Sequence, residues 1–393
     1  MFRMGKEEIE AVARVIEAKQ MFFVNNGTQE CKTFEREWAD KIGTAYSILM
    51  TSGTGALMAA LVGLGVGPGD EVIVPGYTFM ASASAVLAVG AIPVLAEIDE
   101  TMTIDPKDIE KKISKHTKAI IPVHICGYPS NMDAIMEIAG KHNLVVLEDA
   151  CQADGGSYKG RRLGSIGQAG AFSFNYYKLI SAGEGGAMVT SDRKVYERAA
   201  IFHDSGCAFR PYAGEFTEPF FMGTQMRANE VSAAILRVQL TRMDGMIADL
   251  KRIKTQMAAA VDALDNVTVI PSNDIEGDLG TILGFRFETA EAGAKFAELA
   301  KENGLPGYLV ANSGKHIYYN WDPIMKHLGA HCDATNPYNL PQNQGLQTEY
   351  AADMLPQTLD LVNRTYHLPL HCDWTGETVQ EMLALIKKLC AQI

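Results

Sequence analysis

Short apolar runs that alternate with helical segments are the feature that most constrains the fold of this chain. The expected strands are residues 71–75, 92–95, 118–122 and 144–147, and the helices expected between them are residues 78–89, 106–114 and 131–142. Strands that are apolar on both faces are typical of a parallel sheet covered by helices on its two sides. The first part of the chain therefore predicts an α/β fold built on a mostly parallel sheet.

The alternation weakens after Val189, which indicates a second and smaller unit. A chain of 393 residues is long for one hydrophobic core, so two domains are expected. We predict a large domain over residues 1–250 and a small C-terminal α+β domain over residues 251–393. The elements expected in this region are helices at residues 229–264, 290–303 and 376–390, and strands at residues 267–270 and 283–287.

Composition argues against several classes of protein. The net charge is −12 and no local stripe of Lys and Arg occurs, which argues against a nucleic-acid partner. The seven cysteines form no C-x-x-C pair and no H-E-x-x-H motif exists, so we expect no metal site. No apolar stretch is long enough to cross a bilayer, and residues 1–8 lack the apolar segment of a signal peptide. We therefore expect a cytoplasmic protein with no membrane partner.

Lys178 is the strongest candidate for a catalytic residue. It follows the aromatic run of residues 172–177 and precedes the glycine-rich turn of residues 183–186. Burial in such a setting favours the neutral amine, which is a nucleophile toward aldehydes. The commonest such aldehyde in enzymes is pyridoxal phosphate. This cofactor would need three companions, namely an acid for its ring nitrogen, a cradle for its phosphate and an aromatic plate for its ring.

Each companion has a candidate upstream of Lys178. Asp149 ends an apolar strand beside Glu148, at the edge where α/β sheets bind ligands, and the two carboxylates should face opposite ways. The small residues 51–56 precede a helix and suit a phosphate, although Ser and Thr are also ordinary helix caps. Tyr77 or Phe79 could stack on the ring, although an aromatic at a strand end is more often plain core.

Taken together, these segments resemble the DegT/DnrJ/EryC1/StrS family of sugar aminotransferases, which are pyridoxal-phosphate enzymes of fold type I. The resemblance extends over nearly the whole chain. The motifs that carry it are residues 51–57, 74–81, 122–127, 148–153, 158–160, 172–174, 183–187 and 368–371, together with Lys178.

The resemblance implies a role for each residue of the expected site. Lys178 would form a Schiff base with the cofactor and later move protons between substrate and cofactor carbons. Asp149 would pair with the pyridine nitrogen, and Gln152 would contact the ring hydroxyl. The remaining contacts implied are those of Gly53, Thr54 and Ser173 with the phosphate and of Phe79 with the ring.

The resemblance also implies a homodimer whose active sites lie between the two subunits. In the family, an Asn of one subunit contacts the phosphate bound by the other. This chain carries Gln225 at the corresponding place in residues 223–230. Glutamine keeps the amide donor but has a longer side chain.

Within the family, the C-terminal third resembles the branch that aminates C8 of an eight-carbon ulosonic acid, the Kdo8N-type transaminase. Residues 307–308, 315–321 and 148–160 carry this likeness. The branch tends to have Asp where this chain has Asn175, and Thr where it has Leu179, so we expect these two positions to decide the substrate. The candidate substrate contacts are Tyr177, His316, Tyr318 and Tyr319, and the alternative for the last three is a domain-packing strand with two exposed hydroxyls.

The expected activity is transfer of an amino group from an amino acid, with glutamate as donor, to a keto sugar or keto sugar acid. Such a reaction belongs to amino-sugar biosynthesis for lipopolysaccharide, another surface polysaccharide or a natural product. Some family members carry histidine in place of the lysine and act as sugar dehydratases, so Lys178 argues against that alternative. A non-catalytic regulatory homologue is the other alternative, and retention of Lys178, Asp149 and Gln152 together argues against it.

Overall fold

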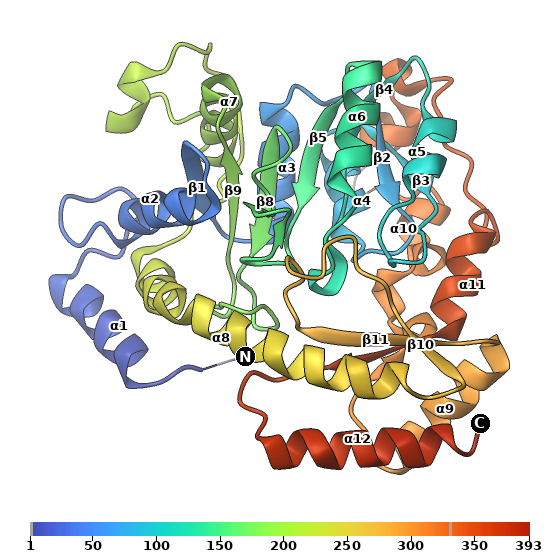
Figure 1. Cartoon of the computed structure of the whole chain (residues 1–393). Helices are drawn as coiled ribbons and strands as arrows, with labels where there is room; N and C mark the ends of the chain where they lie inside the picture. The colour runs from blue at the N-terminus through green and yellow to red at the C-terminus, as the bar shows by residue number, and fades with distance from the viewer. Residues whose placement is uncertain (1–2, 330–331) are drawn as a thin grey trace.

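The computed structural model describes residues 3–329 and 332–393 (Figure 1). A seven-stranded sheet forms its centre. Its strands are β1 (Tyr46–Met50), β2 (Glu71–Pro75), β3 (Ile92–Ala96), β4 (Thr117–Ile120), β5 (Val145–Asp149), β8 (Ala169–Ser173) and β9 (Gly186–Thr190). The strand order is β1-β9-β8-β5-β4-β2-β3, with β2, β3, β4, β5 and β8 parallel and β9 antiparallel to both its neighbours. The mostly parallel sheet confirms the predicted fold class.

Helices cover both faces of this sheet because successive strand residues point to opposite sides. The helices of this part are α1 (Lys6–Ala18), α2 (Glu30–Ile42), α3 (Gly53–Gly63), α4 (Ala81–Ala88), α5 (Pro106–Lys112), α6 (Met132–His142) and α7 (Arg193–His203). In β5, Val146 packs in a cluster with α2, α5 and α6. The next residue, Leu147, packs in a second cluster with α3, α4 and α7. The sheet is therefore buried on both sides, as its apolar strands predict.

The C-terminal part contains a second, antiparallel sheet of four strands. Its elements are α8 (Glu230–Asp262), β10 (Val267–Val269), β11 (Ile282–Phe287), α9 (Ala290–Glu302), β12 (Tyr308–Leu309), α10 (Asp322–Met325), α11 (Pro356–Arg364), β13 (Thr365–Pro369) and α12 (Gly376–Cys390). The strand order is β10-β11-β13-β12. A two-residue hairpin pair, β6 (Ser157–Tyr158) and β7 (Arg161–Arg162), lies between β5 and β8 in the chain.

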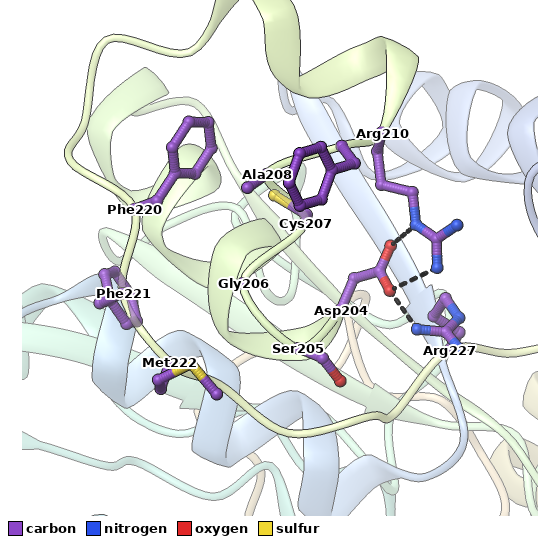
Figure 2. A pocket seen from close by; sticks show the side chains of 11 residues that line it. Asp204, Ser205, Gly206, Cys207, Ala208, Arg210, Phe220, Phe221, Met222 and Arg227 are labelled. Atoms are coloured by element: carbon purple, nitrogen blue, oxygen red, sulfur yellow. Dashed lines mark hydrogen bonds and ion pairs between the residues drawn. The ribbon is translucent and has the colours of Figure 1, made fainter.

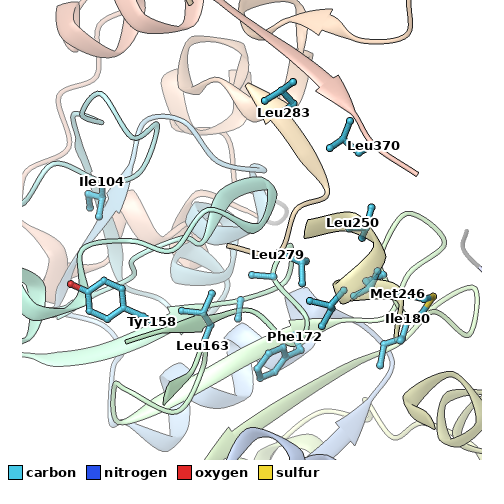
Figure 3. Packing of buried hydrophobic residues seen from close by; sticks show 14 of the residues in the cluster. Ile104, Tyr158, Leu163, Phe172, Ile180, Met246, Leu250, Leu279, Leu283 and Leu370 are labelled. Carbon is cyan, nitrogen blue, oxygen red and sulfur yellow. The ribbon is translucent and has the colours of Figure 1, made fainter. Parts of the chain in front are cut away.

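The two sheets share one hydrophobic cluster, in which α8 connects them (Figure 3). Phe172 of β8 belongs to it, as do Met246 and Leu250 of α8 and Leu283 of β11. Residue 250 lies inside the continuous helix α8. The division into residues 1–250 and 251–393 therefore remains a proposal in which one helix belongs to both parts.

The expected elements do not include β1, β8 and β9 of the large sheet, nor α2 and α7 beside it. The strands β8 and β9 read AGAFS and GAMVT, and their Gly and Ala residues give only a weak strand signal. Gly170 needs its small size, because a Cβ there would collide with the backbone of Gly164. Close backbone packing at Gly170 accompanies the burial of the larger side chains Phe172, Met188 and Val189 in these strands. Among the described residues, no helix combines the length and the apolar character needed to span a bilayer.

Glu148 fastens the end of β5 to the loop that leads into β8. Its side chain is fully buried, and its carboxylate accepts backbone N–H bonds from Gly164 at 2.8 Å, Ile166 at 2.6 Å and Gly167 at 2.7 Å. The fourth partner is the buried His124, whose Nε2 lies 3.0 Å from Oε2. A buried carboxylate is stable only when such donors surround it.

The substitution Glu148→Gln should lower the free energy of unfolding by about 2 to 4 kcal/mol. Glutamine has one acceptor oxygen, so its NH2 group would face a backbone N–H that now has an oxygen partner. Urea unfolding of both proteins measures the difference. The control is Glu137→Gln, which makes the same change on the exposed side of α6 and should leave stability nearly unchanged. Equal stability of Glu148→Gln and the wild type would contradict this account of the strand end.

Candidate active site

A cavity of about 130 Å³ lies where β5 and β8 end and where α3 and α4 begin. The C-terminal edge of parallel strands is where α/β sheets bind ligands. Seven of the residues predicted to bind the cofactor line this cavity, namely Gly53, Thr54, Phe79, Asp149, Gln152, Ser173 and Lys178. The fold thus brings together residues that are far apart in the sequence.

Asp149 presents a fixed carboxylate to the cavity. It is only 5% exposed, and its Oδ2 accepts a hydrogen bond of 2.7 Å from the hydroxyl of Ser82. The hydroxyls of Ser82 and Thr78 are 2.8 Å apart, so a short chain of hydroxyls supports the carboxylate from α4. Its Oδ1 accepts the backbone N–H of Cys151 at 3.1 Å. The carboxylate of Glu148 is buried among its own hydrogen-bond donors and does not line this cavity. The two adjacent carboxylates therefore face opposite ways, as the strand geometry predicts.

The start of α3 forms a tight cradle beside Asp149. Ser52 caps the helix by accepting the N–H of Gly55 at 3.0 Å, so the first amides of the helix remain directed at the cavity. A Cβ on Gly53 would lie 2.8 Å from both Cys151 Sγ and Ser173 Cβ. The backbone therefore approaches this space as closely as a glycine permits, which suits a phosphate held by main-chain amides.

Lys178 lies in a turn after β8, at the junction of the first cavity with a second one of about 500 Å³. Its side chain is half-buried, and its backbone N–H donates to the carbonyl of Asn175 at 3.0 Å. The aromatic neighbours do not enclose it as the sequence suggests, because Tyr176 and Tyr177 are 53% and 81% exposed. The turn rotates these two rings outward, while Phe172 and Phe174 point into the core.

Gln152 and Phe79 line both cavities, as do Asn175 and Lys178. Gln152 Oε1 accepts the backbone N–H of Cys126 at 3.1 Å, which leaves the amide NH2 group as a donor. Phe79 is 43% exposed, and its ring centroid lies 5.4 Å from that of His316. Burial lowers the pKa of His316, so its imidazole is neutral at pH 7.

The second cavity extends from Lys178 to the small sheet. Of the predicted substrate contacts, Tyr177 and His316 line it, and so do the two positions that depart from the Kdo8N branch, Asn175 and Leu179. The sequence analysis missed Tyr308 of β12 and Asp154, which also line this cavity. Tyr308 belongs to the motif of residues 307–308, but nothing in that motif showed which way its side chain points.

Tyr318 and Tyr319 line neither of these cavities. Tyr318 is fully buried, and its hydroxyl donates to the carbonyl of Ala352 at 2.6 Å and accepts the N–H of Leu355 at 3.2 Å. The hydroxyl of Tyr319 lies 3.4 Å from the carbonyl of Ala311. Both rings therefore pack away from the two cavities, in a 3-10 turn over Tyr318–Asn320 and not in the expected packing strand with exposed hydroxyls.

Gln225 lies away from both cavities of its own chain and is exposed. It pairs in an isolated bridge with Asp204, which is held by ion pairs to Arg210 and Arg227 (Figure 2). The loop around it lines a surface pocket of about 620 Å³. Three exposed apolar side chains belong to this pocket, and they are Phe209, Phe220 and Met222.

The groups around the first cavity fit a phosphorylated pyridine aldehyde. The glycine cradle and the start of α3 suit the phosphate, and the buried carboxylate of Asp149 suits a protonated ring nitrogen. Gln152 offers a donor for a ring hydroxyl, and Lys178 offers an amine for the aldehyde.

Curated relatives match much of this chain. It is 37% identical over 289 residues to the 3-amino-5-hydroxybenzoate synthase of Amycolatopsis mediterranei, covering 72% of this chain and 74% of that protein. It is 42% identical over 236 residues to the dTDP-3-amino-3,4,6-trideoxy-alpha-D-glucose transaminase of Streptomyces venezuelae. That second match covers 60% of each chain, so it spans less than two thirds of this relative.

Solved structures share the whole fold. A 3-amino-5-hydroxybenzoic acid synthase superposes with a TM-score of 0.83 at 29% identity, covering 100% of this chain and 98% of the other. An aminotransferase from Psychrobacter cryohalolentis gives 0.84 at 28% identity, covering 100% and 99%. The family model matches residues 3–387. The chain therefore belongs to the DegT/DnrJ/EryC1/StrS aminotransferase family, whose enzymes use pyridoxal 5'-phosphate.

Proposed function

We propose that this protein transfers an amino group from an amino acid, with glutamate as the preferred donor, to a carbonyl carbon of a keto sugar or keto sugar acid. The observation that carries the proposal is the meeting of Lys178, Asp149 and Gln152 in one cavity above the large sheet. A relative named as the transaminase of a dTDP-linked amino sugar and another named as a GDP-perosamine synthase support the carbohydrate acceptor. The product would serve the biosynthesis of lipopolysaccharide, another surface polysaccharide or an amino-sugar natural product.

Bound pyridoxal phosphate supplies an aldehyde that holds the amino group in transit and a ring that accepts electrons from the adjacent carbon. Asp149 keeps a proton on the ring nitrogen, because a buried carboxylate favours the cation beside it. Lys178 would take a proton from the substrate carbon on its Nζ as general base and would later give up that proton as general acid. The position of Lys178 between the two cavities suits this role, since Nζ can serve a cofactor in one and a substrate in the other.

The dehydratase alternative is disfavoured by Lys178, and the non-catalytic alternative by the complete set of groups in the first cavity. The acceptor stays open between two classes. A nucleotide-linked or free keto sugar is supported by the relatives, whereas an eight-carbon keto sugar acid is supported by the motifs of residues 307–308 and 315–321. Asn175 and Leu179, which line the second cavity, are the positions where the choice is expected to be made.

We further propose that the protein is a homodimer with shared active sites. Phe209 is fully exposed and Met222 is 86% exposed, beside the exposed Gln225. Exposed apolar side chains gathered in one patch are typical of an interface. A partner subunit seated on this patch would cover them and would bring Gln225 toward the partner's phosphate site.

The wild type should turn yellow with pyridoxal phosphate and should transfer nitrogen from L-glutamate to at least one acceptor of a panel. The panel contains 2-deoxy-scyllo-inosose, nucleotide-linked 3-keto and 4-keto deoxyhexoses, and an eight-carbon keto sugar acid. The substitution Lys178→Ala should lower turnover by about 100- to 10,000-fold or more, because it removes the group that moves protons. Mass spectrometry of the amino product measures turnover.

Lys301→Ala, an exposed lysine of α9, is the control and should retain turnover and colour. Near-normal turnover of Lys178→Ala would overturn the mechanism. A wild type that aminates nothing in the panel would overturn the proposed acceptor class.

The substitution Gly53→Ala should raise the dissociation constant for pyridoxal phosphate by roughly 5- to 150-fold, the equivalent of about 1 to 3 kcal/mol of overpacking. The added methyl would press on Cys151 and Ser173 and move the start of α3 away from the phosphate. Dialysis to remove the cofactor, followed by titration of the apoprotein, measures the constant. Gly245→Ala in α8 is the matched control, because its Cβ would contact nothing within 4 Å. Equal affinities in the two variants would argue against a phosphate at this cradle.

The wild type should sediment as a dimer, and Met222→Glu should raise the dimer dissociation constant by about tenfold or more, because a buried unpaired charge opposes association. Sedimentation equilibrium over a range of concentrations measures the constant. Ile275→Glu places the same charge on another exposed apolar residue, 77% exposed and outside the proposed interface, and should leave it unchanged. A monomeric wild type at all concentrations would refute the dimer.

A further inference from the structure

Asp154 has a buried carboxyl group, and one of its oxygens has no hydrogen-bond partner among the described residues. It is 1% exposed, and its Oδ1 makes no hydrogen bond. Among the residues that the structure describes, this is the only buried carboxylate oxygen in that condition. Arg162 of β7 donates to the carbonyl of the adjacent Gly155, and Met243 and Ile247 of α8 lie against that glycine, yet none of them donates to Asp154 Oδ1.

Other buried carboxylates of this chain show how such groups are ordinarily satisfied. Glu148 has four donors, and Asp149 accepts from Ser82 and Cys151. Asp278 pairs with Lys254 at 2.7 Å and accepts the N–H of Gly280 at 2.8 Å. Asp154 departs from this pattern. The missing hydrogen bond is therefore specific to this position and not a general feature of the fold.

The place of Asp154 is the wall of the second cavity, beside the candidate reaction centre. It is the only acidic residue among those that line this cavity, and Lys178 is the only basic one apart from the neutral His316. Asp154 and Lys178 thus supply the opposite charges of one cavity wall. A molecule in this cavity would contact both groups.

The backbone around Asp154 is held too firmly for the side chain to withdraw. The N–H of Ala153 donates to the carbonyl of Ala150 at 2.9 Å, and that of Gly156 donates to Ala153 at 3.0 Å. Gly155 has a φ of 87°, and a Cβ there would lie 2.8 Å from both Met243 and Ile247 of α8. This turn therefore fixes the carboxyl at the cavity wall.

A buried carboxyl without a donor is costly, which indicates that the donor comes with a ligand. Burial raises the pKa of Asp154 well above its usual value, while Lys178 opposes that shift. A hydroxyl group suits the carboxyl in both protonation states, because it can donate to the ionised form and accept from the protonated form. A ligand phosphate or carboxylate would instead add a like charge beside it.

We propose that Asp154 binds a hydroxyl group of the carbohydrate acceptor and thereby selects that acceptor over compounds with an anionic or apolar group at the same position. This inference rests on the proposed aminotransferase function and adds a specificity-determining residue to it. A site built to hydrogen-bond a substrate hydroxyl discriminates strongly, because an analogue without it leaves a buried polar group unpaired. Asp154 would thus act on the acceptor half of the reaction and not on the donor half.

The two half-reactions separate these roles in the holoenzyme. Single-turnover absorbance changes with L-glutamate report the donor half, and the reverse changes with the best acceptor of the panel report the second half. Asp154→Asn and Asp154→Leu should lower kcat/KM for the acceptor by about 10- to 100-fold, mainly through KM. Both variants should keep the rate with L-glutamate within about twofold of the wild type. Asp265→Asn, the same change at an exposed position, should alter neither half.

Thermal unfolding supplies a readout that is independent of turnover. A raised pKa in the folded state means that folded Asp154 holds a proton that the unfolded chain releases above about pH 4. The penalty for burying this acid therefore grows as pH rises, and Asp154→Asn removes it. The Tm of the variant should equal that of the wild type near pH 4 and should exceed it near pH 7. This is expected where a binding residue lowers the stability of the fold.

Each outcome bears on the inference. An acceptor KM that is unchanged in both variants would overturn it, because an ordered water would then satisfy Asp154. An equal loss in both half-reactions, or a Tm well below that of the wild type at pH 7, would overturn it in favour of a structural role. A wild type that aminates no acceptor while still reacting with L-glutamate would overturn the acceptor class and this inference together.

Discussion

The alternation of side chains along β5 is the constraint on which the rest of the site depends. Two consecutive carboxylates end this strand, and the geometry of a strand sends them to opposite faces. Glu148 gathers three backbone amides and a histidine on one face. Asp149 is thereby held at the other face, where Ser82 supports it. If β5 shifted by one residue, Glu148 and Asp149 would exchange faces of the sheet. The four hydrogen bonds to Glu148 therefore fix the register of β5.

The two sheets are also joined by a shared hydrophobic core. Because α8 contributes Met246 and Leu250 to the cluster that holds Leu283, the small sheet is packed against the large one. The walls of the second cavity come from both, with Asp154 on the large side and Tyr308 on the small side. The cavity is therefore built between two rigid elements, which suits a site that must hold a substrate in one orientation.

Patterns that depend on local chemistry could be predicted from the sequence. Apolar runs gave four of the seven strands in the large sheet, and the motifs located the residues that line the first cavity. Burial, in contrast, depends on tertiary packing. The sequence could not show that Tyr176 and Tyr177 turn outward, that Tyr318 is core or that Asp154 lacks a partner. The strands β8 and β9 were missed because their Gly and Ala residues, AGAFS and GAMVT, interrupt the apolar run that marks a buried strand.

The four residues that line both cavities have a kinetic consequence. Phe79, Gln152, Asn175 and Lys178 form the passage between the space suited to the cofactor and the space open to substrates. On the proposed function, the amino acid and the carbohydrate must use this second space one after the other, because only one of them can stand beside Lys178 at a time. In excess, either compound would then bind the form of the enzyme that reacts with the other compound, where it cannot react. Because both substrates use the same space, each should inhibit the reaction of the other at high concentration.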